Sequence, residues 1–160
     1  MENTVFYSKV MDALRKENIR ICNFTDHLDK NPLEKKEKIA EYKCAKYRYA
    51  SISLIHSILH NNNRYRKLHN LKDSHYLLLP FDEIFKCYPE YISLYNAAPE
   101  EEKPDYSLYY AISAFTDRNI EELKDMLNGA TDWEAVEVNE RISGLEFAKV
   151  CLDEAWQERK

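Results

Sequence analysis

Two histidines have the spacing of metal ligands. His56 and His60 are four residues apart in a segment with helical periodicity, so both rings can face the same side of one helix. A zinc or iron site needs at least one more ligand, and His69, His75 or Cys87 could supply it. His56 also lies on the apolar stripe of its segment, where a histidine is more often a hydrogen-bonded core residue. The sequence therefore predicts neither a metal nor another cofactor. His56 and His60 are the candidate ligands for the alternative, a metal site.

A basic cluster at residues 64–72 follows these histidines. Its lysines and arginines could neutralise nucleic-acid phosphates, and Tyr65 could stack on a base. Arg64 and His69 also form an Arg-x4-His pair, a spacing that resembles the motif of HEPN-type ribonucleases, which are small helical bundles. That resemblance implies His69 as the acid/base and Arg64 as the group that stabilises charge at an RNA phosphate. The alternative is a solvated basic helix that pairs with the acidic half of its own chain.

Other catalytic signatures are missing from the sequence. There is no GxSxG elbow, no P-loop and no GxGxxG fingerprint, and the only two glycines are Gly129 and Gly144. Neighbouring carboxylates such as Glu121 and Glu122 could act as an acid/base pair, but such pairs usually face solvent. The sequence therefore favours a binding protein over an enzyme.

Tyrosines and carboxylates gather in the second half of the chain. Tyr88, Tyr91 and Tyr95 share the spacing of one helix face, and further tyrosines follow the acidic loop 99–104. Tyrosine is enriched at protein interfaces, and carboxylates steer association with a basic partner. The alternative is that these rings fill a helical core with their hydroxyls at its rim. The predicted partner-binding residues are Tyr91, Tyr95, Glu100, Glu101, Glu102, Asp105, Tyr106 and Tyr109.

Charge is distributed unevenly along the chain. Residues 1–80 hold 15 Lys and Arg against 9 Asp and Glu, and residues 81–160 hold 8 against 19. The halves therefore carry +6 and −11, which sum to the net charge of −5. Such an asymmetry points to a charged partner, or to an oligomer in which opposite halves meet. Nucleic acid is the less favoured partner, because a chain of net charge −5 repels phosphate.

The elements that must position these residues are helical. Apolar residues at spacings of three and four predict a helix from Thr4 to about residue 17, whereas residues 19–28 suit a helix, a strand or a loop. The sequence Asn31-Pro32-Leu33-Glu34 has the form of a capping box and predicts a long central helix over 32–60. Three asparagines at 61–63 should end that helix.

Shorter helices are expected in the rest of the chain. Gly129 is placed to end a helix, and Thr131 with Asp132 caps a final helix of one or two segments, bent at Gly144. A turn at Thr116-Asp117 should separate the last two of the shorter helices. These are predicted over residues 64–73, 80–88, 89–98, 106–115 and 120–127.

The prediction is an all-α fold, a single-domain bundle of about 6–9 helices over residues 1–160, with a possible sub-division at the 99–104 loop. The four cysteines form no CxxC pair, the N-terminus lacks a signal peptide, and the longest apolar run, 76–81, cannot cross a bilayer. We therefore expect a cytoplasmic protein with reduced thiols and no membrane association.

These observations together predict a non-enzymatic, protein-binding module. Its acidic, tyrosine-rich surface would dock a basic protein, and the most concrete case is a bacterial immunity or antitoxin protein that neutralises a nuclease toxin. The alternative is a nucleic-acid-associated helical protein or a HEPN-like ribonuclease that uses Arg64 and His69. The oligomeric state does not follow from the sequence.

Overall fold

The computed structural model describes residues 4–69, 97 and 103–158, and this part of the chain is all-helical without a strand. The all-α prediction is therefore confirmed, but the described residues form five helices and not the expected 6–9. No helix in the described ranges is both long enough and apolar enough to cross a membrane. The five are α1 (Thr4–Asp29), α2 (Pro32–Glu37), α3 (Ile39–His69), α7 (Lys103–Met126) and α8 (Asp132–Gln157).

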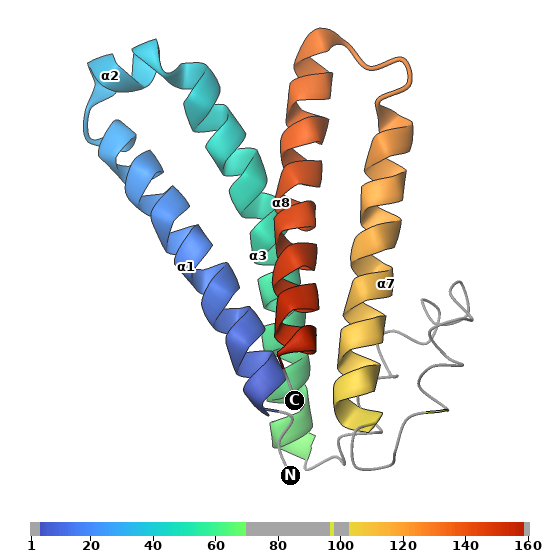
Figure 1. Cartoon of the computed structure of the whole chain (residues 1–160). Coiled ribbons are helices and arrows are strands. Elements are labelled where there is room, and N and C mark those ends of the chain that lie inside the picture. Colours follow the sequence, from blue (N-terminus) through green and yellow to red (C-terminus); the bar gives the residue numbers. More distant parts are fainter. Residues whose placement is uncertain (1–3, 70–96, 98–102, 159–160) are drawn as a thin grey trace.

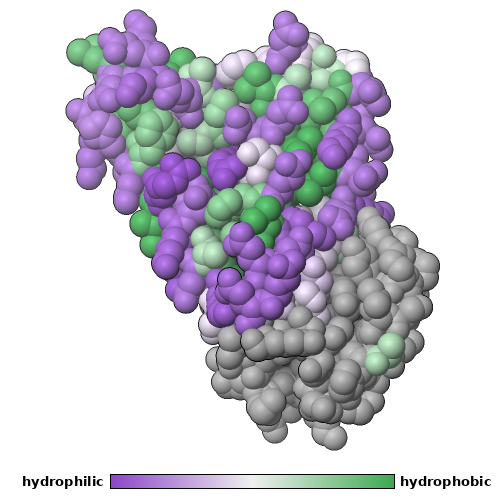
Figure 2. Space-filling view, viewed as in Figure 1, coloured by the Kyte–Doolittle hydropathy of each residue, from purple (hydrophilic) through white to green (hydrophobic). Residues whose placement is uncertain are grey.

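Two of the four long helices form a central pair, and the other two pack on either side of it. α3 and α8 run alongside each other through the middle of the molecule and share the most extensive interface, with α1 beside α3 and α7 beside α8 (Figure 1). α1 also touches α8, and the short α2 links the far ends of α1 and α3. Figure 2 shows that hydrophilic residues cover much of one face, while hydrophobic side chains reach the surface between helices.

The core lies where the four long helices face one another. Its side chains recur every three or four residues, so each helix contributes one apolar stripe. Burying one large aliphatic or aromatic side chain stabilises the fold by about 1.5–3 kcal/mol. The largest fully buried side chains are Phe6, Leu14, Leu28, Ile52, Ile55, Leu59, Ile112, Leu145 and Leu152.

The N-terminal segment forms one helix, not a short helix followed by an undecided stretch. Residues 19–28 continue α1 because the buried Ile21, Thr25 and Leu28 extend the stripe that begins with Val10 and Leu14. The Thr25 hydroxyl donates to the Cys22 carbonyl oxygen at 3.2 Å, so this buried polar group is satisfied within the helix. Tertiary burial therefore decides a segment whose local sequence fitted three conformations.

The predicted helix over 32–60 begins at Pro32 as expected, but it is divided near its start and extends beyond its predicted end. The chain breaks at Lys38 between α2 and α3, and α3 runs unbroken through the asparagines at 61–63 to His69. Asparagine disfavours a helix interior only mildly, so established helix can continue through it. Asn31 precedes α2 without a side-chain cap, and its amide instead donates to the His27 carbonyl oxygen of α1 at 2.7 Å.

The expected turn at Thr116-Asp117 is also absent, because α7 is continuous from Lys103 to Met126. Thr116 is fully buried, and its hydroxyl donates to the Ile112 carbonyl oxygen at 2.7 Å, which a helix interior accommodates. The predicted cap at Thr131 is confirmed, although Glu134 and not Asp132 completes it as a reciprocal capping box. Gly129, predicted to end the preceding helix, adopts a φ of +81°.

Gly144 lies inside an uninterrupted α8, so the expected division of this helix is not observed. It faces α3 at very short range. A Cβ atom built at Gly144 would lie 2.8 Å from the carbonyl oxygen of Arg48 and 2.8 Å from the Cβ of Ser51. Only a residue without a side chain lets the backbones of α3 and α8 come this close.

Replacing Gly144 by alanine should lower the free energy of unfolding by about 1–3 kcal/mol, because the added methyl group would force the central helices apart. Urea unfolding followed by circular dichroism measures this change. Gly129→Asn is the control, since a Cβ there meets no atom within 4 Å and asparagine tolerates positive φ. It should cost less than about 1 kcal/mol. An unaltered unfolding midpoint for Gly144→Ala would contradict the close contact.

Candidate functional site

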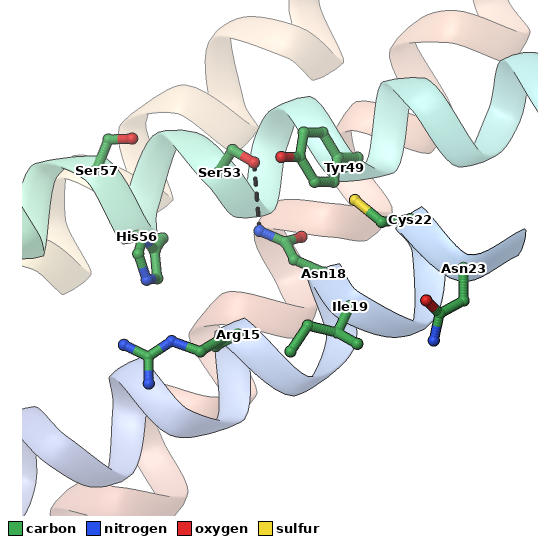
Figure 3. A pocket seen from close by; sticks show the side chains of 9 residues that line it. All are labelled: Arg15, Asn18, Ile19, Cys22, Asn23, Tyr49, Ser53, His56 and Ser57. Atoms are coloured by element: carbon green, nitrogen blue, oxygen red, sulfur yellow. Dashed lines mark hydrogen bonds between the residues drawn. The ribbon is translucent and has the colours of Figure 1, made fainter. Parts of the chain in front are cut away.

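A groove between α1 and α3 has the size of a small-molecule site. Its cavity volume is about 440 Å³, and it is lined by polar, aromatic and aliphatic side chains from both helices (Figure 3). The spacing within each set places its members on one helix face, beside the buried stripe. α1 contributes Arg15, Asn18, Ile19, Cys22 and Asn23, and α3 contributes Tyr49, Ser53, His56 and Ser57.

The middle of this groove holds a buried amide that is only half satisfied. The Asn18 Nδ2 atom donates to the Ser53 hydroxyl oxygen at 3.2 Å, which joins the two helices (Figure 3). The Asn18 Oδ1 atom is buried and has no hydrogen-bond partner. Buried polar atoms are nearly always paired, so this acceptor calls for a donor from outside the chain.

One end of the groove is cationic. Arg15 and His56 lie there on facing helices, whereas Tyr49 and Cys22 lie at the other end (Figure 3). Burial lowers the pKa of His56, and the positive charge of Arg15 and the neighbouring His60 lower it further. Since none of the nine lining residues is an Asp or Glu, Arg15 carries the only fixed charge among them.

The predicted metal candidates do not form a metal centre in the described part of the chain. The His56 and His60 rings are stacked with centroids 6.3 Å apart. Among the described residues no group of three or more His, Cys, Asp or Glu could hold an ion. Of the possible third ligands, the side chain of His69 and all of His75 and Cys87 lie outside the described part.

Two of the described cysteines are poorly suited to nucleophilic chemistry. Cys22, Cys44 and Cys151 are free, Cys151 is buried, and Cys22 and Cys44 are half-buried. Burial raises the pKa of Cys151 to about 11, and burial with the nearby Glu140 raises that of Cys44. Thiols whose pKa is raised hold little thiolate near neutral pH, so neither is suited to nucleophilic catalysis.

A second surface lies at the end of the α7–α8 hairpin. Residues 117–140 hold eight Asp or Glu against two Lys or Arg, a net charge of −6. Two large apolar side chains are nevertheless exposed here, Met126 at 60% and Trp133 at 49%, the latter with Lys43 over its ring. We call this surface the acidic hairpin end, and it comprises Glu121, Asp125, Met126, Asp132, Trp133 and Glu134, all exposed.

Most of the predicted partner-binding residues cannot be located. Tyr91, Tyr95 and Glu100–Glu102 lie outside the described residues, and Asp105 and Tyr106 lie in the first turns of α7 without described side chains. The sequence did not single out the acidic hairpin end, because Met126 and Trp133 have helical spacing that fits a buried face equally well. It also missed the groove, whose two faces belong to segments more than 25 residues apart.

Tyr109 is the one predicted partner-binding residue with a described side chain, and it is half-buried in the bundle. Its hydroxyl donates to an Asp153 carboxylate oxygen at 2.6 Å, and its ring stacks on Trp156 with centroids 4.5 Å apart. Phe6 meets both rings edge-on at 5.9 and 5.8 Å. Tyr109 therefore joins α1, α7 and α8, in agreement with the alternative in which a tyrosine fills the core with its hydroxyl at the rim.

The basic cluster continues the central helix. Arg64 and His69 lie in the last turns of α3, and their side chains lie outside the description, so the HEPN-like arrangement stays a prediction. α3 carries six Lys or Arg and one Glu, and α8 carries seven Asp or Glu and two Lys or Arg. The two helices in the most extensive contact thus have charges of +5 and −5. Part of the charge asymmetry is therefore balanced within the chain.

Arg48 makes the most specific polar contact between these two helices. Its guanidinium donates to the Ser143 hydroxyl at 2.6 Å and lies over the Phe147 ring, 5.1 Å from its centroid. It also pairs with Glu17 of α1 at 3.8 Å, and that carboxylate accepts a further hydrogen bond from Arg20. One partly buried cation thereby connects α1, α3 and α8.

No protein-family model, curated protein or solved structure matches this chain significantly.

Removing the Tyr109 hydroxyl tests its structural role. Tyr109→Phe should lower the free energy of unfolding by about 1–2 kcal/mol, because Asp153 loses a charge-assisted hydrogen bond. Thermal and urea unfolding measure the loss. Asp153→Asn should cost a similar amount, and combining the two substitutions should cost less than the sum of both. Strictly additive losses would show that the two side chains do not interact.

Proposed function

We propose that this protein is a non-enzymatic binding module whose acidic C-terminal half docks onto a basic protein partner. The observation that carries the proposal is the acidic hairpin end, where two large apolar side chains are exposed among carboxylates. Carboxylates raise the rate of encounter with a cationic surface, and desolvated aromatic and methionine side chains supply contact energy.

The exposure of Met126 and Trp133 is the reason to favour binding over a purely structural role. A 60% exposed methionine and a 49% exposed tryptophan keep apolar surface in water, which costs free energy in the isolated protein. Val136, 37% exposed, lies one turn further along α8. A partner that covers this surface recovers that cost, and tryptophan is frequent among residues that dominate binding energy.

Charge complementarity favours a basic protein as the partner. With a net charge of −6 over residues 117–140, the hairpin attracts a cationic protein and repels nucleic acid. The tyrosine-bearing segment before α7, with Tyr91, Tyr95 and Glu100–Glu102, is proposed to give the partner a further acidic and aromatic contact. A bacterial immunity or antitoxin protein that neutralises a cationic nuclease toxin in the cytoplasm is the most concrete case of such a binder.

Charge reversal at the hairpin end tests this function. The proteins encoded by the genes on either side of this one are to be produced and purified separately, and a basic protein among them is the partner to test. Glu121→Lys combined with Asp125→Lys should slow association by about tenfold at low salt and by much less at high salt. Stopped-flow or biolayer interferometry at several ionic strengths measures the rate.

The control variant reverses two exposed acids at the C-terminal end of α8, far from the hairpin turn, Glu154→Lys with Glu158→Lys, and makes the same change in net charge (Figure 1). It should affect association far less. Equal slowing by both variants would show a general charge effect, and failure of any basic neighbour to bind would contradict the proposal. An RNA-cleaving activity that His69→Ala abolishes would instead support the ribonuclease alternative.

A further inference from the structure

We propose that the groove between α1 and α3 binds a small organic anion with a planar apolar body and a hydrogen-bond donor. The site is separate from the acidic hairpin end, because it is built from the other helix pair (Figures 1 and 3). Its cavity of about 440 Å³ lies within the range of small-molecule sites, roughly 300–1,000 Å³.

The sign of the ligand's charge follows from the lining. Among the described lining residues Arg15 alone carries a fixed charge, and its guanidinium makes a long, exposed contact of 3.4 Å with the Asp12 carboxylate. Exposed pairs of this kind contribute little, so the guanidinium can exchange Asp12 for a ligand carboxylate or phosphate. The half-buried imidazole of His56, whose pKa is lowered by burial, lies opposite and offers a further hydrogen-bonding group without opposing an anion (Figure 3).

The apolar body of the ligand follows from the side chains that line the groove away from its cationic end. Ile19 is 52% exposed and Tyr49 is 37% exposed, and both line the groove beside Cys22. Ile19 lies one helical turn beyond Arg15, about 6 Å along α1. A planar ring next to a carboxylate therefore spans from the guanidinium to the Tyr49 ring and covers apolar surface that water otherwise contacts.

The hydrogen-bond donor follows from Asn18. Its Oδ1 atom is buried between the two helices without a partner, while its Nδ2 atom is held by Ser53. Because water does not reach this atom, the Asn18 amide must turn toward the ligand before an N–H or O–H group on the ligand's ring pairs with it. Supplying a partner to an unpaired buried polar atom recovers about 1–3 kcal/mol, which favours ligands that carry such a donor.

Three indole probes that differ in charge test the proposal. Isothermal titration of the wild-type protein should show indole-3-acetate binding with a Kd near or below about 1 mM. The neutral indole-3-acetamide and the cationic tryptamine should bind at least about tenfold more weakly. Phenyl phosphate distinguishes a phosphate-bearing from a carboxylate-bearing ligand, because tighter binding of this probe would assign the anion as phosphate. Absence of binding by both anions, or equal affinity for all the probes, would overturn the proposal.

Arg15→Gln should weaken indole-3-acetate binding by at least about tenfold, whereas Lys16→Gln should leave it nearly unchanged. Lys16 is the matched control because it is the next residue on α1, is exposed, and does not line the groove. Equal weakening by the two variants would show non-specific attraction only and would overturn the assignment.

A chemical readout keeps the proposal testable if a variant folds poorly. Indole-3-acetate should slow modification of wild-type Cys22 by N-ethylmaleimide at least about threefold, as measured by peptide mass spectrometry, because Cys22 lines the groove. Modification of Cys44, which is half-buried elsewhere, should not change and serves as the internal control. Unchanged labelling of Cys22 under saturating probe would place any bound anion outside the groove.

Discussion

The close contact between α3 and α8 is the constraint on which the rest of the bundle depends. These helices share the most extensive interface, and at Gly144 the α8 backbone comes so near Arg48 that no side chain fits between them. A contact this short fixes the separation of the central pair. α1 and α7 then pack on either side, and the apolar stripes of all four long helices meet in one core.

The same contact balances part of the charge asymmetry. α3 and α8 carry opposite charges of five units each and lie against each other, so the positive half of the chain is partly the counterpart of the negative half. The carboxylates around residues 117–140 project from the end of the hairpin and include exposed groups without such a counterpart, among them Glu121 and Asp125. The potential available to a partner is therefore concentrated at the hairpin end, away from the groove between α1 and α3.

The sequence predicted helices where apolar residues recur at helical spacing. It also predicted those helix boundaries that are set by hydrogen bonds and backbone angles of neighbouring residues. Thr131 with Glu134 and the positive φ of Gly129 are set by the residues themselves. It failed where burial outweighed local preference. Thr116 sits in a helix interior because the core encloses it, and residues 19–28 are helical because Ile21 and Leu28 complete a buried stripe. The groove was beyond sequence reasoning, because Asn18 and Ser53 become neighbours only when α1 packs on α3.

The sequence by itself determined that this protein is all-helical, that its charge is divided between its halves, and where two of its helix boundaries fall. These properties depend on spacing, composition and short-range hydrogen bonds, which act within a few residues along the chain. The tertiary structure alone decided which helices are continuous, that Tyr109 faces Trp156 and Asp153, and that Arg15 and His56 face each other across a cavity. Those features arise from contacts between residues about 40 or more positions apart, whose free energy exceeds the weak local preferences of asparagine, threonine and glycine.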